Sequence, residues 1–98
     1  MKRKTGINGD QEAALYEAIL ELKTVDELRS FFQDLCTPAE IADFCDRWVV
    51  AQLLIKDTPY RTIAAETGVS TTTIGRVARF LHDGNGGYKT VLERQGKL

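Results

Sequence analysis

A chain of 98 residues, 43% hydrophobic and 28% charged, has the composition of one soluble globular domain with a modest core. Its longest dense apolar run, residues 48–55, is too short to span a bilayer. The basic residues Lys2, Arg3 and Lys4 are followed by a polar stretch, where a signal peptide needs an apolar one. These features exclude membrane and secreted proteins, and they predict a cytoplasmic protein without a membrane partner.

The net charge of −1 hides an uneven distribution along the chain. Residues 11–50 carry nine acidic and three basic side chains, whereas residues 51–98 carry four acidic and seven basic ones. We therefore expect any polyanionic partner to meet the second half of the chain. The alternative is an ordinary mixed surface.

The first half of the chain predicts a flexible N-terminal arm over residues 1–9, followed by two helices. Asp10 is the expected N-cap of a helix over about residues 11–22, in which apolar residues recur at spacings of three and four. Thr24 and Glu27 form a capping box before a second helix with a similar apolar stripe.

The sequence Thr37-Pro38-Ala39-Glu40 predicts the start of a long third helix that extends to about Lys56. The first half of this helix is apolar on one side, and its second half is apolar on nearly every side. Such a helix must be buried all round, and a small chain offers few neighbours to cover it. We therefore expect an obligate two-fold homodimer. The alternative is that this helix forms the centre of a monomeric bundle.

Two short helices with almost no loop between them follow. Thr58 and Pro59 predict the start of the first, Gly68 ends it, and Ser70 caps the second, which continues to about His82. Together they form a helix-turn-helix over about residues 58–82. The apolar residues expected to pack the pair together are Ile63, Val69, Ile74 and Val77. A glycine-rich loop and a helix over residues 88–94 complete an all-α chain of about six helices.

The beginning of the second motif helix carries small, hydroxylated and cationic side chains. Such side chains suit a helix end that enters the major groove of DNA. The residues expected to read base edges are Ser70, Thr71, Thr72, Thr73 and Gly75, and those expected to contact phosphates are Lys56, Arg61, Arg76 and Arg79. A helix-turn-helix also occurs as a plain packing unit. The alternative function is therefore a helical protein–protein interaction module in which the motif is only a scaffold.

The potentially reactive side chains do not form a catalytic or metal-binding pattern. Cys36 and Cys45 are nine residues apart, and His82 is the one histidine, so neither a zinc site nor a redox pair is indicated. Both cysteines lie on or beside an apolar helix face, which predicts buried, inert thiols. We expect no enzymatic activity, no metal and no cofactor.

Residues 36–81 resemble the tryptophan repressor family, and within it the YerC-like branch. The residues that carry the resemblance are Cys36, Thr37, Pro38, Glu40, Arg47, Leu53, Leu54, Arg61, Glu66, Gly68, Thr73, Ile74 and Arg76. The resemblance implies an intertwined, all-helical homodimer that binds operator DNA and represses transcription. It also implies that residues 10–98 form a single DNA-binding domain.

The resemblance further implies a ligand pocket, because the tryptophan repressor holds its corepressor between two arginines that correspond to Arg47 and Arg76. The family uses a glycine and a serine where this chain has Val77 and Phe80. Val77 adds bulk beside the indole space, and Phe80 removes a hydroxyl and could itself fill the cavity. These four residues therefore predict a vestigial pocket in a regulator that requires neither tryptophan nor another small-molecule corepressor.

Overall fold

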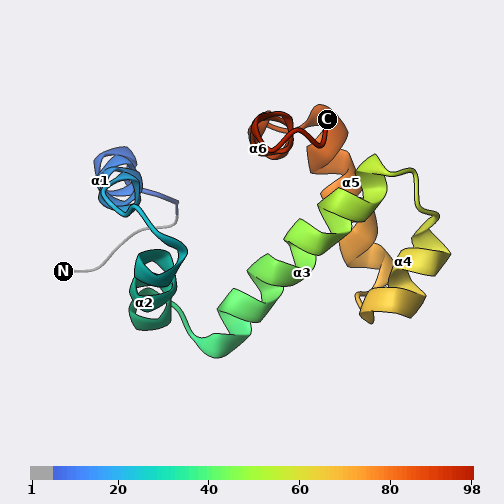
Figure 1. Cartoon of the computed structure of the whole chain (residues 1–98), viewed down its shortest axis with the longest axis horizontal. Helices are drawn as coiled ribbons and strands as arrows, with labels where there is room; N and C mark the ends of the chain where they lie inside the picture. Colours follow the sequence, from blue (N-terminus) through green and yellow to red (C-terminus); the bar gives the residue numbers. More distant parts are fainter. Residues whose placement is uncertain (1–5) are drawn as a thin grey trace. The chain divides into compact units, whose positions relative to one another are not determined.

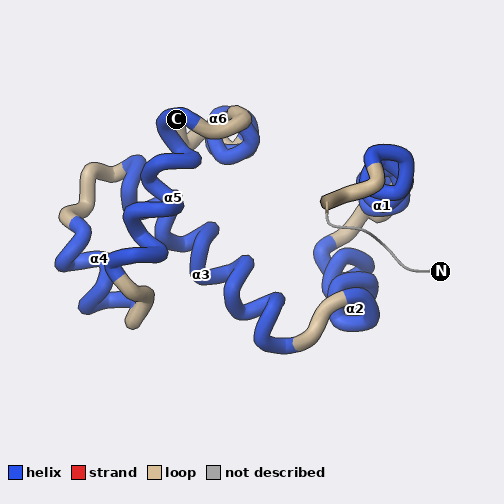
Figure 2. The backbone as a smooth tube through the Cα atoms, turned by 180° about the vertical axis from the view of Figure 1, so that it is seen from behind, coloured by secondary structure: helices blue, strands red, loops and turns tan. Residues whose placement is uncertain are grey.

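The structure is a computed structural model that describes residues 6–98, and all of its regular elements in that range are helices (Figure 2). The helices are α1 (Gly9–Leu20), α2 (Val25–Leu35), α3 (Pro38–Ile55), α4 (Tyr60–Thr67), α5 (Thr71–Asp83) and α6 (Gly87–Arg94). The prediction of six helices and an all-α fold is confirmed. The basic residues Lys2, Arg3 and Lys4 lie outside the described residues.

The chain divides into two compact units, residues 1–38 and residues 39–98. The single domain expected over residues 10–98 stays a prediction. Within the described part of the chain, no helix combines the length and the apolar character that crossing a bilayer requires.

In the first unit, α1 begins earlier than expected because Asn8, and not Asp10, is its N-cap. The Asn8 side chain accepts hydrogen bonds from the backbone N–H groups of Asp10 and Gln11, at 3.0 and 3.1 Å. These bonds satisfy two amides that a helix start leaves without partners. The helix also ends earlier, at Leu20, so Leu22 lies beyond it.

The capping box at the start of α2 is confirmed. Thr24 Oγ1 accepts a hydrogen bond from the backbone N–H of Glu27 at 3.1 Å, and the Glu27 carboxylate accepts one from the backbone N–H of Lys23 at 2.7 Å. No side chain of α1 or α2 is buried. Leu20 is 81% exposed and Leu35 is 50% exposed, so both helices keep exposed apolar side chains in the single chain.

The core lies in the second unit, where the C-terminal half of α3 packs against the helix-turn-helix (Figure 1). Val50 and Ala51 of α3 are completely buried there. The four residues expected to pack the motif, Ile63, Val69, Ile74 and Val77, are all buried in the same cluster, which confirms that prediction. Val49 is 42% exposed, and Leu53, Leu54 and Ile55 are half-buried, so the second half of α3 is not buried on every side within the single chain.

The first half of α3 has no buried residue. Phe44 is 44% exposed, and Cys45 is exposed. The prediction of two buried thiols is therefore wrong for Cys45, and Cys36 is only half-buried. The reason is that an apolar helix face is buried only where another element covers it.

The turn between α4 and α5 forms through local hydrogen bonds. Gly68 adopts the left-handed conformation, with φ 76°, and its N–H donates to the Ala64 carbonyl at 2.9 Å, as expected for a glycine that ends a helix. The Thr67 hydroxyl donates to the Ile63 carbonyl at 2.7 Å and accepts from the Val69 N–H at 3.1 Å. The turn therefore leaves few backbone groups unsatisfied.

The start of α4 differs from the prediction. Pro59 occupies the N-cap position with an extended backbone, and no side chain caps the helix. Thr58 was expected to be the cap, but it lies one residue too early for its hydroxyl to reach the first free amides. The cap of α5 is as expected, because Ser70 Oγ accepts from the Thr73 N–H at 3.2 Å.

Candidate nucleic-acid interface

The candidate reading surface is the solvent-facing side of α5. The opposite side of the helix anchors it, with Ile74, Val77, Ala78 and Leu81 all buried. Ser70, Thr71 and Thr72 are exposed, whereas Thr73 and Gly75 are half-buried at the border between the two sides. Three of the five residues expected to read bases are therefore exposed to solvent.

The hydroxyl groups at the beginning of α5 differ in whether they already have a hydrogen-bond partner within the protein. The Ser70 hydroxyl caps the helix and also donates to Thr73 Oγ1 at 3.1 Å, so these two side chains are already engaged with each other. Within residues 6–98, the hydroxyls of Thr71 and Thr72 have no hydrogen-bond partner. Each hydroxyl can both donate and accept, so these two threonines are the side chains best placed to read a base edge.

The four cations expected to contact phosphates are all exposed. Arg76 and Arg79 lie on α5, where they line a shallow hollow of about 420 Å³ together with Thr72 and Gly75. The structure therefore brings two predicted phosphate contacts next to two predicted base readers. The other two cations lie on different elements, with Lys56 just after α3 and Arg61 on α4.

None of these cations is neutralised by an acidic side chain in the described part of the chain. The ion pair that the structure does contain joins Arg29 and Asp26 of α2, at 2.6 Å. Unpaired guanidinium and ammonium groups on one unit favour a polyanionic partner, because no local carboxylate competes for them.

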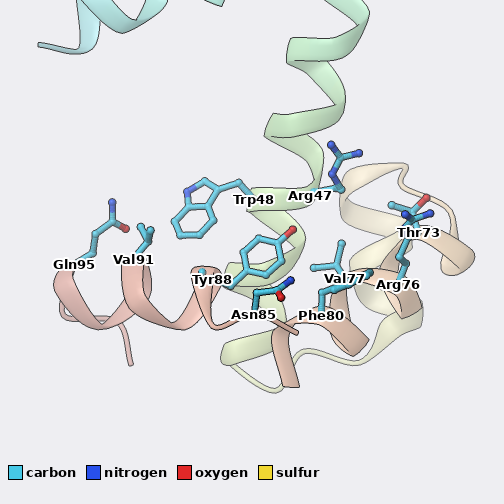
Figure 3. Close-up of a pocket in the computed structure, with 11 residues that line it drawn as sticks. Arg47, Trp48, Thr73, Arg76, Val77, Phe80, Asn85, Tyr88, Val91 and Gln95 are labelled. Atoms are coloured by element: carbon cyan, nitrogen blue, oxygen red, sulfur yellow. The ribbon is translucent and has the colours of Figure 1, made fainter. Parts of the chain in front are cut away.

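A second concavity of about 1060 Å³ opens between α3, α5 and α6 (Figure 3). All four residues of the expected vestigial pocket, Arg47, Arg76, Val77 and Phe80, line it. The structure therefore brings together the residues that the family resemblance selected. Arg76 lines both concavities and so lies between the pocket and the candidate DNA surface.

The remaining pocket residues include several that the sequence did not single out for this site. Trp48 of α3 stacks against Tyr88 of α6, with ring centroids 6.3 Å apart and planes inclined by 15° (Figure 3). The others are Thr73, Asn85, Gly87, Val91 and Gln95. Thr73, an expected base reader, thus also borders the pocket. Trp48 directly follows Arg47 and could have been suspected, but no local signal places α6 beside α3.

Arg47 is half-buried, and its guanidinium carbon lies 5.4 Å from the centroid of the Phe44 ring. This distance is within the range of a cation–π contact. In residues 6–98, no group of histidine, cysteine, aspartate or glutamate side chains is arranged to hold a metal ion. The groups that the two concavities present to a ligand are cations, hydroxyls and aromatic rings.

Comparison with known proteins shows which family the sequence matches. The profile of the family described as Trp repressor protein matches residues 10–96. The uncharacterized protein YerC of Bacillus subtilis (strain 168) is 42% identical over 88 residues, which cover 90% of this chain and 85% of that protein. Members of the Trp repressor family are regulators rather than enzymes.

Two solved structures have the same fold. A TrpR-like protein from Eubacterium eligens ATCC 27750 superposes with a TM-score of 0.84 at 48% identity, covering 88% of this chain and 89% of that one. A protein from Staphylococcus aureus, provisionally named a Trp repressor, superposes with a TM-score of 0.87 at 40% identity, covering 93% and 91% of the two chains.

Proposed function

The chain belongs to the Trp repressor family, and from this premise we propose that it is a transcriptional repressor that binds specific sequences in double-stranded DNA. The observation that carries the proposal is the exposed beginning of α5. There, Thr72 lies beside Arg76 and Arg79 in one hollow, and Thr71 is exposed next to it in sequence. Within residues 6–98, the hydroxyls of both threonines lack a hydrogen-bond partner and both arginines lack an ion pair.

In this mechanism the buried side of α5 holds the helix on α3 and α4, while the opposite side enters the major groove. The residues proposed to contact base edges are Ser70, Thr71, Thr72, Thr73 and Gly75. Those proposed to contact phosphates are Arg61, Arg76, Arg79 and Lys56. The phosphate contacts supply affinity and register, and the contacts to base edges supply sequence preference.

We propose that the active form is a homodimer, because the single chain leaves too many apolar side chains uncovered. Leu20, Val25 and Leu35 are between 50% and 81% exposed. Burial of one such side chain contributes about 1.5–3 kcal/mol, so a partner copy that covers several of them would bind stably. A two-fold dimer would read two half-sites separated by about 34–36 Å, or by a multiple of that distance.

We propose that repression does not require tryptophan. Val77 is 1% exposed and borders the pocket where the family has a glycine, and the Phe80 ring borders it where the family has a serine. Val77 reduces the space for an indole, and Phe80 removes a hydroxyl that could contact the amino acid.

Selection of bound fragments from a random duplex pool at physiological salt tests the proposed function. We expect enriched fragments with two symmetric half-sites. If the pure protein shifts no duplex even at low salt, DNA binding is refuted and the interaction-module alternative is favoured.

A substitution tests the reading surface directly. Thr72→Glu should weaken binding to the selected site by about 1–3 kcal/mol, since a carboxylate replaces a hydroxyl next to bases and phosphates. It should also reduce the difference in affinity between the selected site and other sequences. The matched control is Thr90→Glu on α6, which adds the same charge at an exposed threonine of the same unit. Equal effects of the two changes would contradict the proposed role of Thr72.

A further inference from the structure

Phe80 is an unusual residue for its position. It is a large apolar side chain, 38% exposed, on the helix whose solvent side carries the candidate DNA contacts. Its ring has cations as close neighbours. The guanidinium carbon of Arg79 lies 5.2 Å from the ring centroid, and that of Arg76 lies 5.9 Å from it.

Both distances fall within about 6 Å, the range in which a ring attracts a cation. Arg76 lies four residues before Phe80, so the two side chains emerge on the same side of the helix. Neither arginine forms an ion pair or a hydrogen bond through its side chain within residues 6–98. The ring is therefore the feature of the described structure that restrains these two long side chains.

Resting on the proposed DNA binding, we propose that Phe80 is a positioning residue: its ring holds the guanidinium groups of Arg76 and Arg79 ready for the phosphate backbone. A guanidinium is planar, and its five N–H donors point outward from its edges. A ring against one face leaves those edges free, so contact with the ring and contact with a phosphate can exist together.

The energetic advantage lies in the unbound state. A free arginine side chain has many rotamers, and a phosphate contact must order them. The ring restricts these rotamers before DNA arrives, so less freedom is lost on binding. An exposed cation–π contact changes an equilibrium by about 2- to 5-fold, and the ring makes two such contacts. Only the part of this energy that orders the side chains before binding adds to affinity, so the loss of the ring should weaken DNA binding by about 3- to 10-fold.

The test compares three variants of the full chain in binding to the selected duplex. Phe80→Leu removes the ring but keeps an apolar side chain, and it should weaken binding by about 3- to 10-fold. Phe80→Tyr keeps an aromatic ring, so its affinity should lie within about 2-fold of the wild-type affinity. Val91→Ala, which removes apolar surface from the same pocket away from the arginines, should bind like the wild type.

A double-mutant cycle separates positioning from a structural role. In a chain that carries Arg76→Gln and Arg79→Gln, the further change Phe80→Leu should alter affinity by less than about 2-fold, because no guanidinium is left to hold. An equal loss in both backgrounds, or full binding by Phe80→Leu, would overturn the inference.

NMR spectroscopy of the free protein supplies a readout that needs no DNA. The side-chain Nε–H signals of Arg76 and Arg79 should show upfield ring-current shifts that disappear in Phe80→Leu. Absence of these shifts in the wild type would overturn the inference by itself. Failure of the wild type to bind any duplex would instead refute the proposed function, so the two failures can be told apart.

Discussion

The number of phosphates that the protein neutralises can be measured through one side chain, Arg79. It is exposed on α5, it lines the hollow that contains Thr72, and it forms no ion pair in the described part of the chain. Replacement by alanine removes one proposed phosphate contact from each protomer, and therefore two from the proposed dimer.

Each neutralised phosphate contributes about 0.9 to the slope of the logarithm of affinity against the logarithm of salt concentration. Loss of two contacts should therefore make this slope shallower by about 1.8. Between about 50 and 200 mM salt, the wild type should lose about 12-fold more affinity than Arg79→Ala loses. Binding should weaken on every sequence alike, because phosphates carry no sequence information.

Fluorescence anisotropy with a labelled duplex, measured across this salt range on a selected and on a scrambled sequence, gives both slopes. Arg29→Ala is the matched control, because Arg29 is an exposed arginine that already pairs with Asp26. Its slope should equal that of the wild type. An unchanged slope for Arg79→Ala would refute the assignment of Arg79 to the backbone of DNA.

Three further outcomes are expected. Gly68→Ala should lower the free energy of unfolding by about 1–2 kcal/mol in urea titrations, since φ is 76° at this turn and a Cβ there would meet no atom within 4 Å; a much larger loss would show that more than backbone strain is involved. Calorimetry should detect no micromolar binding of tryptophan, and clear binding in the pocket that contains Arg47 and Arg76 would contradict the proposed independence from a corepressor. Leu35→Glu should convert the proposed dimer to a monomer in sedimentation equilibrium, because Leu35 is 50% exposed in the single chain and we expect a partner copy to cover it; a wild type with the mass of one chain would refute the dimer.

The sequence by itself determined where most helices begin and end. The bond from Glu27 to Thr24, the cap at Ser70 and the left-handed Gly68 each involve residues no more than four positions apart. Such signals can be read locally, because the atoms that form them are neighbours in any helix of the chain. The wrong choice of Asp10 as the N-cap of α1 was also a local one, since Asn8 is an equally good cap two residues earlier.

The tertiary structure alone decided which distant side chains share a site. Trp48 and Tyr88 stack although they are far apart in sequence, and Lys97 donates a hydrogen bond to Gln52 across 45 positions at 2.7 Å. The exposure of Cys45 on an apolar helix face was also decided by the tertiary structure. Periodicity shows which face of a helix is apolar, but burial depends on the element that covers the face, and that element is fixed only when the chain has folded.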